Sequence, residues 1–418
     1  MITFFISALK IIFVLGFLIL IHECGHFFVA KLCKVTVNEF SIGFGPIILK
    51  KQGKETKYTL RLIPLGGFVN LEGEEEHSNK EGSFSKASIP KRMAIVLAGG
   101  LVNIIFAVIV YFTLMTCVGN NTSLVINEII PEYAAEETEL QTGDKIVKIN
   151  GKSVNIKSDV DKILENCNGE QLVITVERDG KKQEINLLPT KIEYKSTGIY
   201  LKSSGESTKI VTIDAKSNAE KQGIKPNDEI IRINGKEVKN QSEIIEIINE
   251  EKNETLQFEL KRGNEQISIE VEPDINYNYY LGVNFKQSEN TISNNLYYAI
   301  FKTRDFSFSI FNNLKNLFTG NVRIDQFMGP VGISEVVVKT NKIEDFIYIL
   351  ALISLSLGVT NLLPIPALDG GKFILLLIEA ITKKKISERV EMNIQLIGFL
   401  FLIALSIYIS YNDILRII

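Results

Sequence analysis

The chain has no tryptophan and very little histidine or cysteine. Among its 418 residues there are only three His (His22, His26 and His77) and four Cys. Four scattered cysteines are too few for a disulfide-stapled scaffold, and three histidines exclude a His-rich metal site. With 45% hydrophobic and 23% charged residues, the composition also excludes intrinsic disorder and a collagen-like fibre. The length allows roughly two to four domains.

Excess positive charge is also lacking. The formal net charge is −3, and it divides unevenly along the chain. Residues 119–290 hold 22 basic and 31 acidic residues, whereas the remainder holds 24 basic and 18 acidic ones. No basic nucleic-acid surface is indicated, so we expect no nucleic-acid partner.

Long apolar runs are the dominant positive feature. Four of them reach the roughly 20 residues that a membrane-spanning helix needs: Phe4–Ala30, Ala94–Val118, Phe346–Leu363 and Met392–Asn412. Buried core helices are the alternative, but four runs of this length favour a polytopic α-helical protein in a lipid bilayer. The first run is followed by no small-residue cleavage site, so we expect an uncleaved signal anchor.

The short loops predict the orientation of these helices. Residues 31–92 carry 11 Lys/Arg and residues 364–391 carry five. The positive-inside bias places both loops in the cytoplasm, and the long segment 119–345 then lies outside.

An internal repeat occupies this long segment. The stretch QTGDKIVKINGKSV at 141–154 matches KPNDEIIRINGKEV at 225–238, with seven of 14 positions identical and an offset of 84 residues. The same offset, without a gap, aligns Arg178 of the first copy with Arg262 of the second. Two copies of one module are therefore predicted, each with an Asn-Gly hairpin turn, a short amphipathic helix and an alternating strand pair.

The order of elements in each copy resembles the PDZ domain. Residues 218–228 of the second copy are similar to the helix and turn common in bacterial PDZ modules, whereas the first copy is looser there. PDZ domains bind extended peptides by adding a strand to a sheet edge. A pair of spacer domains with covered grooves is the alternative, because edge binding is not visible in a sequence.

The candidate chemistry begins inside the first apolar run, where residues 22–26 read His-Glu-Cys-Gly-His. Residues four apart share a helix face, so His22 and His26 can reach one zinc ion. Glu23 lies beside them, where it can activate the attacking water. A Glu within a membrane helix is costly and by default functional, although polar contact between helices is the alternative. Cys24 points away from the pair and is expected to pack.

A catalytic zinc site has three protein ligands and one open position. His77 lies in the polar loop Glu72–His77 and is expected to be a solvated surface residue. A carboxylate near the membrane is the better candidate for the third ligand. The segment Asn361–Gly371 (NLLPIPALDGG) supplies Asp369 at the end of the third run, where two prolines break the helix. An ordinary turn with Asp369 as a cap is the alternative.

Together these motifs resemble the site-2 protease family, and most closely its bacterial regulator of sigma-E protease type. The pattern is H-E-x-x-H in a first membrane helix, N-x-x-P-x-P-x-x-D-G in a later one, and PDZ modules between them. Further similar fragments are 40–46 and 61–68 (a membrane-associated β-hairpin), 98–103 (the second helix, with Gly100 where Pro is common) and 329–333.

The resemblance implies an intramembrane zinc (Zn²⁺) metalloprotease of the bacterial cell membrane with its active site toward the cytoplasm. His22, His26 and Asp369 match its metal ligands, Glu23 its general base, and Asn361 a residue that contacts substrate or the oxyanion. Its substrates are single-pass membrane proteins already trimmed outside, namely trimmed anti-sigma factors and signal peptide remnants. The stretch Tyr58–Ile63 could pair with the unwound substrate, or form a hairpin without a substrate role.

The expected fold is thus four transmembrane helices, a membrane-associated β-hairpin and two tandem α+β PDZ domains on the outer side. The expected boundaries are 1–118, 122–197, 198–285, an amphipathic connector at 286–345, and 346–418. Two other functions stay open. One is a catalytically inactive, membrane-anchored PDZ scaffold, and the other is a membrane metalloprotease with its modules in the cytoplasm that acts on soluble substrates.

Overall fold

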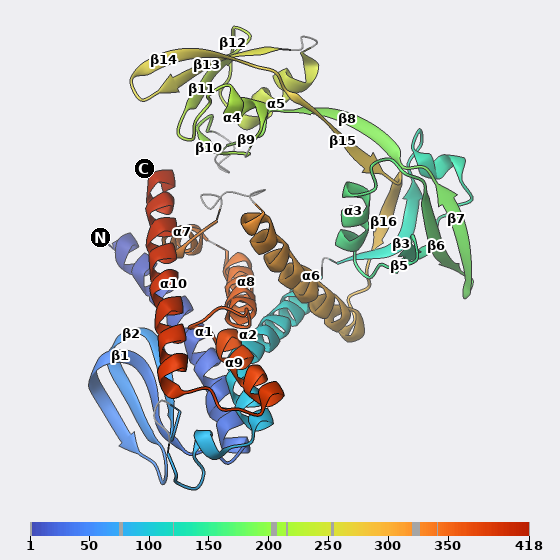
Figure 1. Cartoon of the computed structure of the whole chain (residues 1–418). Helices are drawn as coiled ribbons and strands as arrows, with labels where there is room; N and C mark the ends of the chain where they lie inside the picture. Colours follow the sequence, from blue (N-terminus) through green and yellow to red (C-terminus); the bar gives the residue numbers. More distant parts are fainter. Residues whose placement is uncertain are drawn as a thin grey trace. The chain divides into compact units, whose positions relative to one another are not determined.

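The computed structural model describes residues 2–74, 78–119, 121–201, 207–214, 216–251, 255–319, 327–340 and 342–417. His77, expected on the surface, lies outside these residues. The chain divides into two compact units (Figure 1). A helical unit is formed mainly by residues 1–118, 295–311 and 328–411, and a strand-rich unit mainly by residues 119–294.

The apolar runs form long helices in the helical unit. They are α1 (Ile2–Leu32), α2 (Ile89–Val118), α8 (Ile343–Asn361) and α10 (Glu388–Ile417). Among the described residues, these four helices are long and apolar enough to cross a membrane, with mean hydropathies of 1.7 to 2.7. The expectation of a protein with four membrane-length helices is confirmed. Helix α2 is central, since it packs against both α1 and α8.

Three other helices complete this part of the chain: α6 (Ile292–Phe318), α7 (Pro330–Lys339) and α9 (Asp369–Thr382). Helix α9 was not predicted, because its 14 residues are too short to span a bilayer. It follows the proline-rich turn after α8 and packs against α2. This turn-and-helix arrangement places the start of α9 inside the helical unit.

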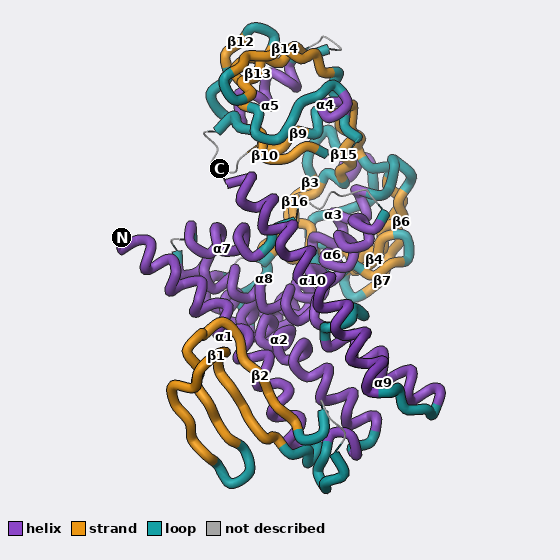
Figure 2. The backbone as a smooth tube through the Cα atoms, turned by 60° about the vertical axis from the view of Figure 1, so that its left-hand side comes forward, coloured by secondary structure: helices purple, strands orange, loops and turns teal. Residues whose placement is uncertain are grey.

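Two long strands, β1 (Val37–Gln52) and β2 (Lys57–Leu71), form a hairpin beside α1 (Figure 2). Both strands bend, so Ile42 of β1 pairs with Leu60 in one half of β2 and with Gly67 in the other half. The bend in β1 contains Gly43 and Gly45, both in the left-handed region with φ near 86° and 82°, which glycine adopts without steric cost. The result is a small sheet built from two strands.

The strand-rich unit contains two modules with the same order of strands, and the second has the short helix α4 where the first has a 3₁₀ turn at Ala134–Glu137. The first consists of β3 (Thr122–Ile129), β4 (Lys145–Ile149), β5 (Lys152–Ser153), α3 (Lys157–Glu165), β6 (Leu172–Arg178), β7 (Lys181–Leu187), β8 (Thr190–Ser196) and β9 (Ile199–Leu201). The second consists of β10 (Ile210–Ile213), α4 (Asn218–Lys221), β11 (Glu229–Ile233), β12 (Lys236–Glu237), α5 (Gln241–Glu250), β13 (Leu256–Arg262), β14 (Glu265–Val271), β15 (Asp274–Tyr280) and β16 (Val283–Gln287). Each module encloses its own buried apolar cluster.

The same ion pair stabilises both modules. The guanidinium of Arg178 donates from Nε to Asp144 Oδ1 at 2.6 Å and from Nη2 to Asp144 Oδ2 at 2.7 Å. Arg262 makes the same two bonds to Asp228 at 2.8 and 2.7 Å. Because both residues of each pair are 84 positions apart between copies, the sequence offset corresponds to a real structural repeat.

The two copies exchange their last strands. Strand β9 ends the first copy in sequence but pairs with β10 of the second, whereas β16 ends the second copy and pairs with β3 of the first. The preceding strands β8 and β15 pair with each other as an antiparallel ribbon between the two modules. The expected boundary at residue 285 therefore differs from the structure, since residues 283–287 join the first module's sheet.

Candidate metal centre

His22 and His26 lie on one face of α1, one helical turn apart. Their Nε2 atoms are 3.2 Å from each other and the rings meet edge to face. Both side chains are largely buried, with exposures of 12% and 15%. The i, i+4 spacing therefore brings two imidazole nitrogens to one point, as the motif predicts.

Asp369 comes to the same point from α9, where it is the first helical residue. Its Oδ2 atom lies 3.2 Å from His22 Nε2 and 3.4 Å from His26 Nε2. Oδ2 is buried and accepts no other hydrogen bond from the described residues. A carboxylate oxygen held there between two imidazole nitrogens needs a cation or a proton as a partner.

The spacing of these three atoms fits a single metal ion. In a tetrahedral site with metal–ligand distances of about 2.0–2.1 Å, neighbouring ligand atoms lie about 3.3–3.4 Å apart. The observed separations of 3.2, 3.2 and 3.4 Å are close to that edge length. Two imidazoles and one carboxylate are also a donor set found in catalytic zinc sites.

Gly99 of α2 leaves room beside the three atoms. A Cβ on Gly99 would lie 2.4 Å from His26 Nε2 and 2.6 Å from His22 Nε2. Any side chain would therefore fill the space next to the two nitrogens. In the sequence, Gly99 is distinguished only by belonging to the helix fragment 98–103.

Helix α2 also supplies polar partners for the outer nitrogens of both rings. The Nδ1 atom of His26 lies 2.8 Å from the carbonyl oxygen of Ile95. The Nδ1 atom of His22 lies 3.4 Å from the side-chain amide of Asn103. Metal-binding histidines usually donate this second N–H to a carbonyl or carboxylate, which fixes the ring. Neither partner was predicted, because a backbone carbonyl and a lone helical Asn carry no spacing signal.

Glu23 follows His22 on α1 and faces the hairpin. A Cβ on Gly67 of β2 would be 3.4 Å from the Glu23 Cγ atom, so the glycine lets the strand approach this side chain. Glu23 is half-buried and lies within electrostatic range of His22, His26 and Asp369. A carboxylate in this position can exchange a proton with a group bound at the centre.

The turn before Asp369 is tightly constrained. A Cβ on Gly370 would lie 2.2 Å from the carbonyl oxygen of Leu363, and one on Gly371 would lie 2.3 Å from that of Ile365. Ala367 has a φ of 73°, which is uncommon for a residue with a side chain, and its N–H donates to Gln395 Oε1 of α10 at 2.5 Å. Glycines and this contact with α10 thus define where α9 starts.

Two ion pairs hold the rest of α9. Glu379 forms a two-bond pair with Arg92 of α2, with Nη2–Oε1 at 2.7 Å and Nη1–Oε2 at 3.2 Å, and both side chains are largely buried. Lys372 contacts Glu74, just after β2, at 2.6 Å. The helix that carries Asp369 is therefore anchored to α2 and to the hairpin.

Among the other candidates, Asn361 is the last residue of α8 and is half-buried. Cys24 is a free, partly buried cysteine outside the cluster of three side chains. Of the described residues, only His22, His26 and Asp369 form a His, Cys, Asp or Glu cluster of metal-binding size.

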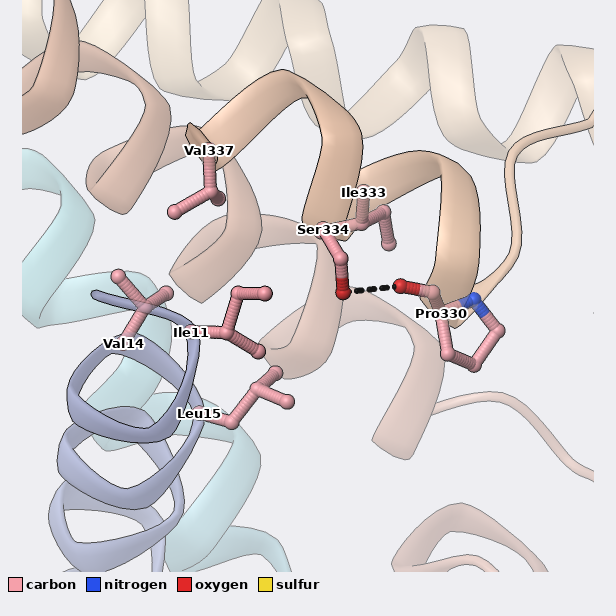
Figure 3. A pocket seen from close by; sticks show the side chains of 7 residues that line it. All are labelled: Ile11, Val14, Leu15, Pro330, Ile333, Ser334 and Val337. Carbon is pink, nitrogen blue, oxygen red and sulfur yellow. Dashed lines mark hydrogen bonds between the residues drawn. The ribbon is translucent and has the colours of Figure 1, made fainter. Parts of the chain in front are cut away.

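A separate apolar pocket of about 200 Å³ lies between α1 and α7 (Figure 3). Its lining is Ile11, Val14, Leu15, Pro330, Ile333, Ser334 and Val337. The one hydroxyl in it, on Ser334, already donates to the carbonyl oxygen of Pro330 at 2.6 Å. The pocket therefore presents no reactive group and does not overlap the cluster.

A three-residue cluster with a neighbouring carboxylate, formed by the membrane-length helix α1 and the shorter helix α9 packed among such helices, is the arrangement expected of a membrane-embedded metalloprotease. The family model of "Peptidase family M50" matches residues 10–405. The chain therefore belongs to peptidase family M50, the site-2 protease family, and it is a zinc metalloprotease.

Its relatives match over essentially their whole length. The regulator of sigma-E protease RseP of Escherichia coli is 27% identical over 449 residues, which cover 100% of both chains. The regulator of sigma E protease of Haemophilus influenzae is 28% identical, covering 99% of this chain and 100% of the relative. A Thermotoga maritima protein, named provisionally as a zinc metalloprotease, is 28% identical over 97% of this chain and 98% of its own.

Among solved structures, the PDZ domain of HtrA3 bound to a phage-derived ligand matches 21% of this chain and 93% of that domain. The identity is 19% and the TM-score is 0.19.

Proposed function

We propose that His22, His26 and Asp369 bind a catalytic zinc ion and that Glu23 is the general base of peptide-bond hydrolysis. The observation that carries this proposal is the set of three separations between ligand atoms, which range from 3.2 to 3.4 Å. Gly99 has no side chain to fill the space beside these atoms. A bound zinc polarises a carbonyl oxygen and makes water more acidic. Glu23 accepts the proton of the attacking water and returns it to the leaving amine. Asn361 contacts the substrate or the developing oxyanion.

The proposed substrates are transmembrane segments of single-pass membrane proteins that have already been trimmed outside. Trimmed anti-sigma factors and signal peptide remnants are the expected classes, and the names of the E. coli and H. influenzae relatives support a role in a sigma-factor pathway. A substrate helix must unwind before its peptide bonds can be reached. The β1–β2 hairpin beside Glu23 offers strand edges for the unwound segment.

The apolar surface of the hairpin supports its placement at the membrane. Its exposed side chains include Phe44, Ile48, Leu49, Leu62 and Ile63, each between 46% and 63% exposed. Such a cluster is unusual on a strand that faces only water.

We further propose that the protein lies in the bacterial cell membrane with the metal centre toward the cytoplasm. The Lys/Arg-rich segments 31–92 and 364–391 support this orientation. His22 and His26 are near the Lys31 end of α1, and Asp369 follows α8 at the corresponding end. The two repeated modules are then outer PDZ domains that bind the new end of a trimmed substrate or exclude untrimmed ones.

Zinc analysis of the purified full chain tests the metal centre. One tightly bound zinc per chain is expected, with loss of zinc in His22→Ala and His26→Ala and strong weakening in Asp369→Ala. Cys24→Ala is the matched control on the same helix and should retain zinc. Full zinc occupancy in His22→Ala would overturn the ligand set, and a wild-type protein without zinc or proteolysis would favour the inactive scaffold.

Cleavage of matched substrates tests the modules. Residues 122–287 are replaced by a short linker, which is feasible because the N–H of Ser288 donates to the carbonyl oxygen of Asn121 at 2.7 Å. If the modules exclude untrimmed substrates, the deletion gains cleavage of them. If the modules deliver trimmed substrates, cleavage of those falls. No change for either substrate would leave the modules as spacers.

A further inference from the structure

We propose that Asn103 is a positioning residue of the metal centre, whose side-chain oxygen accepts a hydrogen bond from Nδ1–H of His22. The inference rests on the proposed zinc ligands. It assigns a role to a helix α2 residue outside the motifs that carry the ligands.

The geometry of His22 determines where its proton must be. Nε2 faces the centre, 3.2 Å from both His26 Nε2 and Asp369 Oδ2. Nε2 must be unprotonated to bind a metal, so a neutral His22 ring carries its one proton on Nδ1. That N–H is a donor within the helical unit and needs an acceptor.

Asn103 is the side chain that meets Nδ1. Its amide nitrogen, Nδ2, lies 3.4 Å from His22 Nδ1, and its Oδ1 atom is buried and has no hydrogen-bond partner among the described residues. A half-turn of the amide about its last bond presents Oδ1 to the ring, and this breaks no other hydrogen bond of that oxygen. Asn103 is fully buried in an apolar helix, where an unused amide is costly.

The surroundings of Asn103 hold it in place. Its backbone carbonyl accepts a hydrogen bond from Ser354 Oγ of α8 at 3.0 Å. A Cβ on Gly358 of α8 would lie 3.2 Å from the Asn103 Cβ atom, so the neighbouring helix leaves little room for movement. The amide is thus presented to His22 from a fixed backbone position.

One face of α2 serves both imidazoles at a spacing of four residues. Ile95 offers its carbonyl to Nδ1 of His26, Gly99 leaves space beside the ligand atoms, and Asn103 faces Nδ1 of His22. Helix geometry places residues four apart on one side. The two partners, Ile95 and Asn103, are eight residues apart and lie on either side of Gly99, so each meets the outer nitrogen of a different ring.

The test compares Asn103→Leu and Asn103→Asp in the full-length protein. Leu has a similar size but accepts no hydrogen bond, whereas Asp retains an acceptor oxygen. Zinc affinity is measured by competition with a chelator, and ligand geometry by the visible absorption of the Co²⁺-substituted protein. Loss of a histidine's outer partner typically costs about 10–100-fold in metal affinity. We expect that loss and an altered Co²⁺ spectrum for Leu, and near wild-type behaviour for Asp.

Thr113→Val is the matched control, since it replaces a polar side chain of α2 whose hydroxyl donates to the carbonyl oxygen of Ile109 and not to either histidine. It should leave zinc affinity unchanged. Wild-type affinity and spectrum in Asn103→Leu, or equal losses in the Leu and Asp variants, would overturn the role of Asn103 while leaving the zinc site intact. Absence of zinc from the wild-type protein would overturn the proposed function itself.

Discussion

Gly99 of α2 faces His26 of α1 so closely that a Cβ on Gly99 would lie 2.4 Å from the imidazole Nε2 atom. The contact involves the nitrogen that points to the centre of the cluster. Gly99 is therefore required by the metal centre and not by helix α2, in which a residue with a side chain would be more stable.

Gly99→Ala should consequently abolish zinc binding and proteolysis. Helix propensity alone predicts the opposite tendency, because Ala stabilises a helix interior by roughly 0.5–1 kcal/mol relative to Gly. Zinc content and circular dichroism of the purified variant distinguish these effects. Gly100→Ala is the control for disturbed helix packing, since its Cβ would meet Leu362, directly after α8, and the carbonyl oxygen of Gly358 in α8 instead of the imidazoles. Full zinc content in Gly99→Ala would contradict the prediction.

Glu23→Gln should retain zinc and the fold but lose proteolysis. The amide keeps the shape of the side chain and cannot accept a proton from water. The measurement is cleavage of a membrane substrate together with zinc content of the same preparation. Activity near that of the wild-type protein would show that another group is the base.

Replacing one residue of the Arg92–Glu379 ion pair should destabilise the protein more than replacing both. Replacement of one partner leaves an unpaired buried charge, which typically costs about 3–5 kcal/mol. Arg92→Met and Glu379→Met should each lower thermal stability and weaken zinc binding through α9. The double variant should recover much of both, because no buried charge remains. A double variant less stable than either single one would contradict this account.

The strand-rich unit should fold by itself and lose stability in acid. Burial raises the pKa of Asp144, but its hydrogen bonds and charge interaction with Arg178 outweigh this and lower the pKa overall. A lowered folded-state pKa means that the pair stabilises the fold above the unfolded Asp pKa of about 3.9. That contribution is lost as the pH falls through the folded-state value.

Fragment 121–288 suits this experiment because it retains β16, which completes the sheet of the first module. Its unfolding in urea should show stability decreasing below about pH 4, and Asp144→Asn should be less stable at pH 7 with a flatter acid limb. It contains none of the proposed ligands, so it should bind no zinc. An unchanged pH profile in Asp144→Asn would assign the acid sensitivity to other groups.

The proposed orientation predicts a simple labelling pattern. In a background without the native cysteines, Asn79→Cys should be protected from an impermeant thiol reagent in intact cells, whereas Gln183→Cys should react. Both positions are exposed on their own units. Disruption of the membrane should make Asn79→Cys reactive as well. The reverse pattern would place the metal centre outside the cell.

Local spacing made part of the site predictable. His22, Glu23 and His26 occupy adjacent turns of one helix, so their proximity follows from helix geometry alone. The cluster with Asp369 depends on the turn at 362–368 and on α9, which the apolar pattern did not reveal because that helix is short. The roles of Gly99 and Asn103 depend on how α2 packs against α1. Helix packing of this kind leaves no periodic pattern in the sequence, so these roles could not be predicted.

The module boundary shows a similar limit. The 84-residue offset correctly indicated two copies of the same order of elements, and the Asp–Arg pairs follow it residue by residue. The exchange of β9 and β16 could not be seen, because a strand has the same sequence pattern whichever sheet edge it joins. In the structure, β8 and β15 run side by side as an antiparallel pair, and each leads its chain into the sheet of the other module.

Because of this strand exchange, an internal deletion can remove one of the two modules but not the other. The first module is assembled from two chain segments, one before and one after the second module. The second module is formed by one continuous chain segment that includes β9. A deletion between β8 and β15 would remove the second module and leave both segments of the first, with β3 and β16 still able to pair. No single internal deletion removes the first module and leaves the second with its chain connections. A shortened member of such an architecture would therefore keep the module next to Val118 and Ile292 and lose the inserted one.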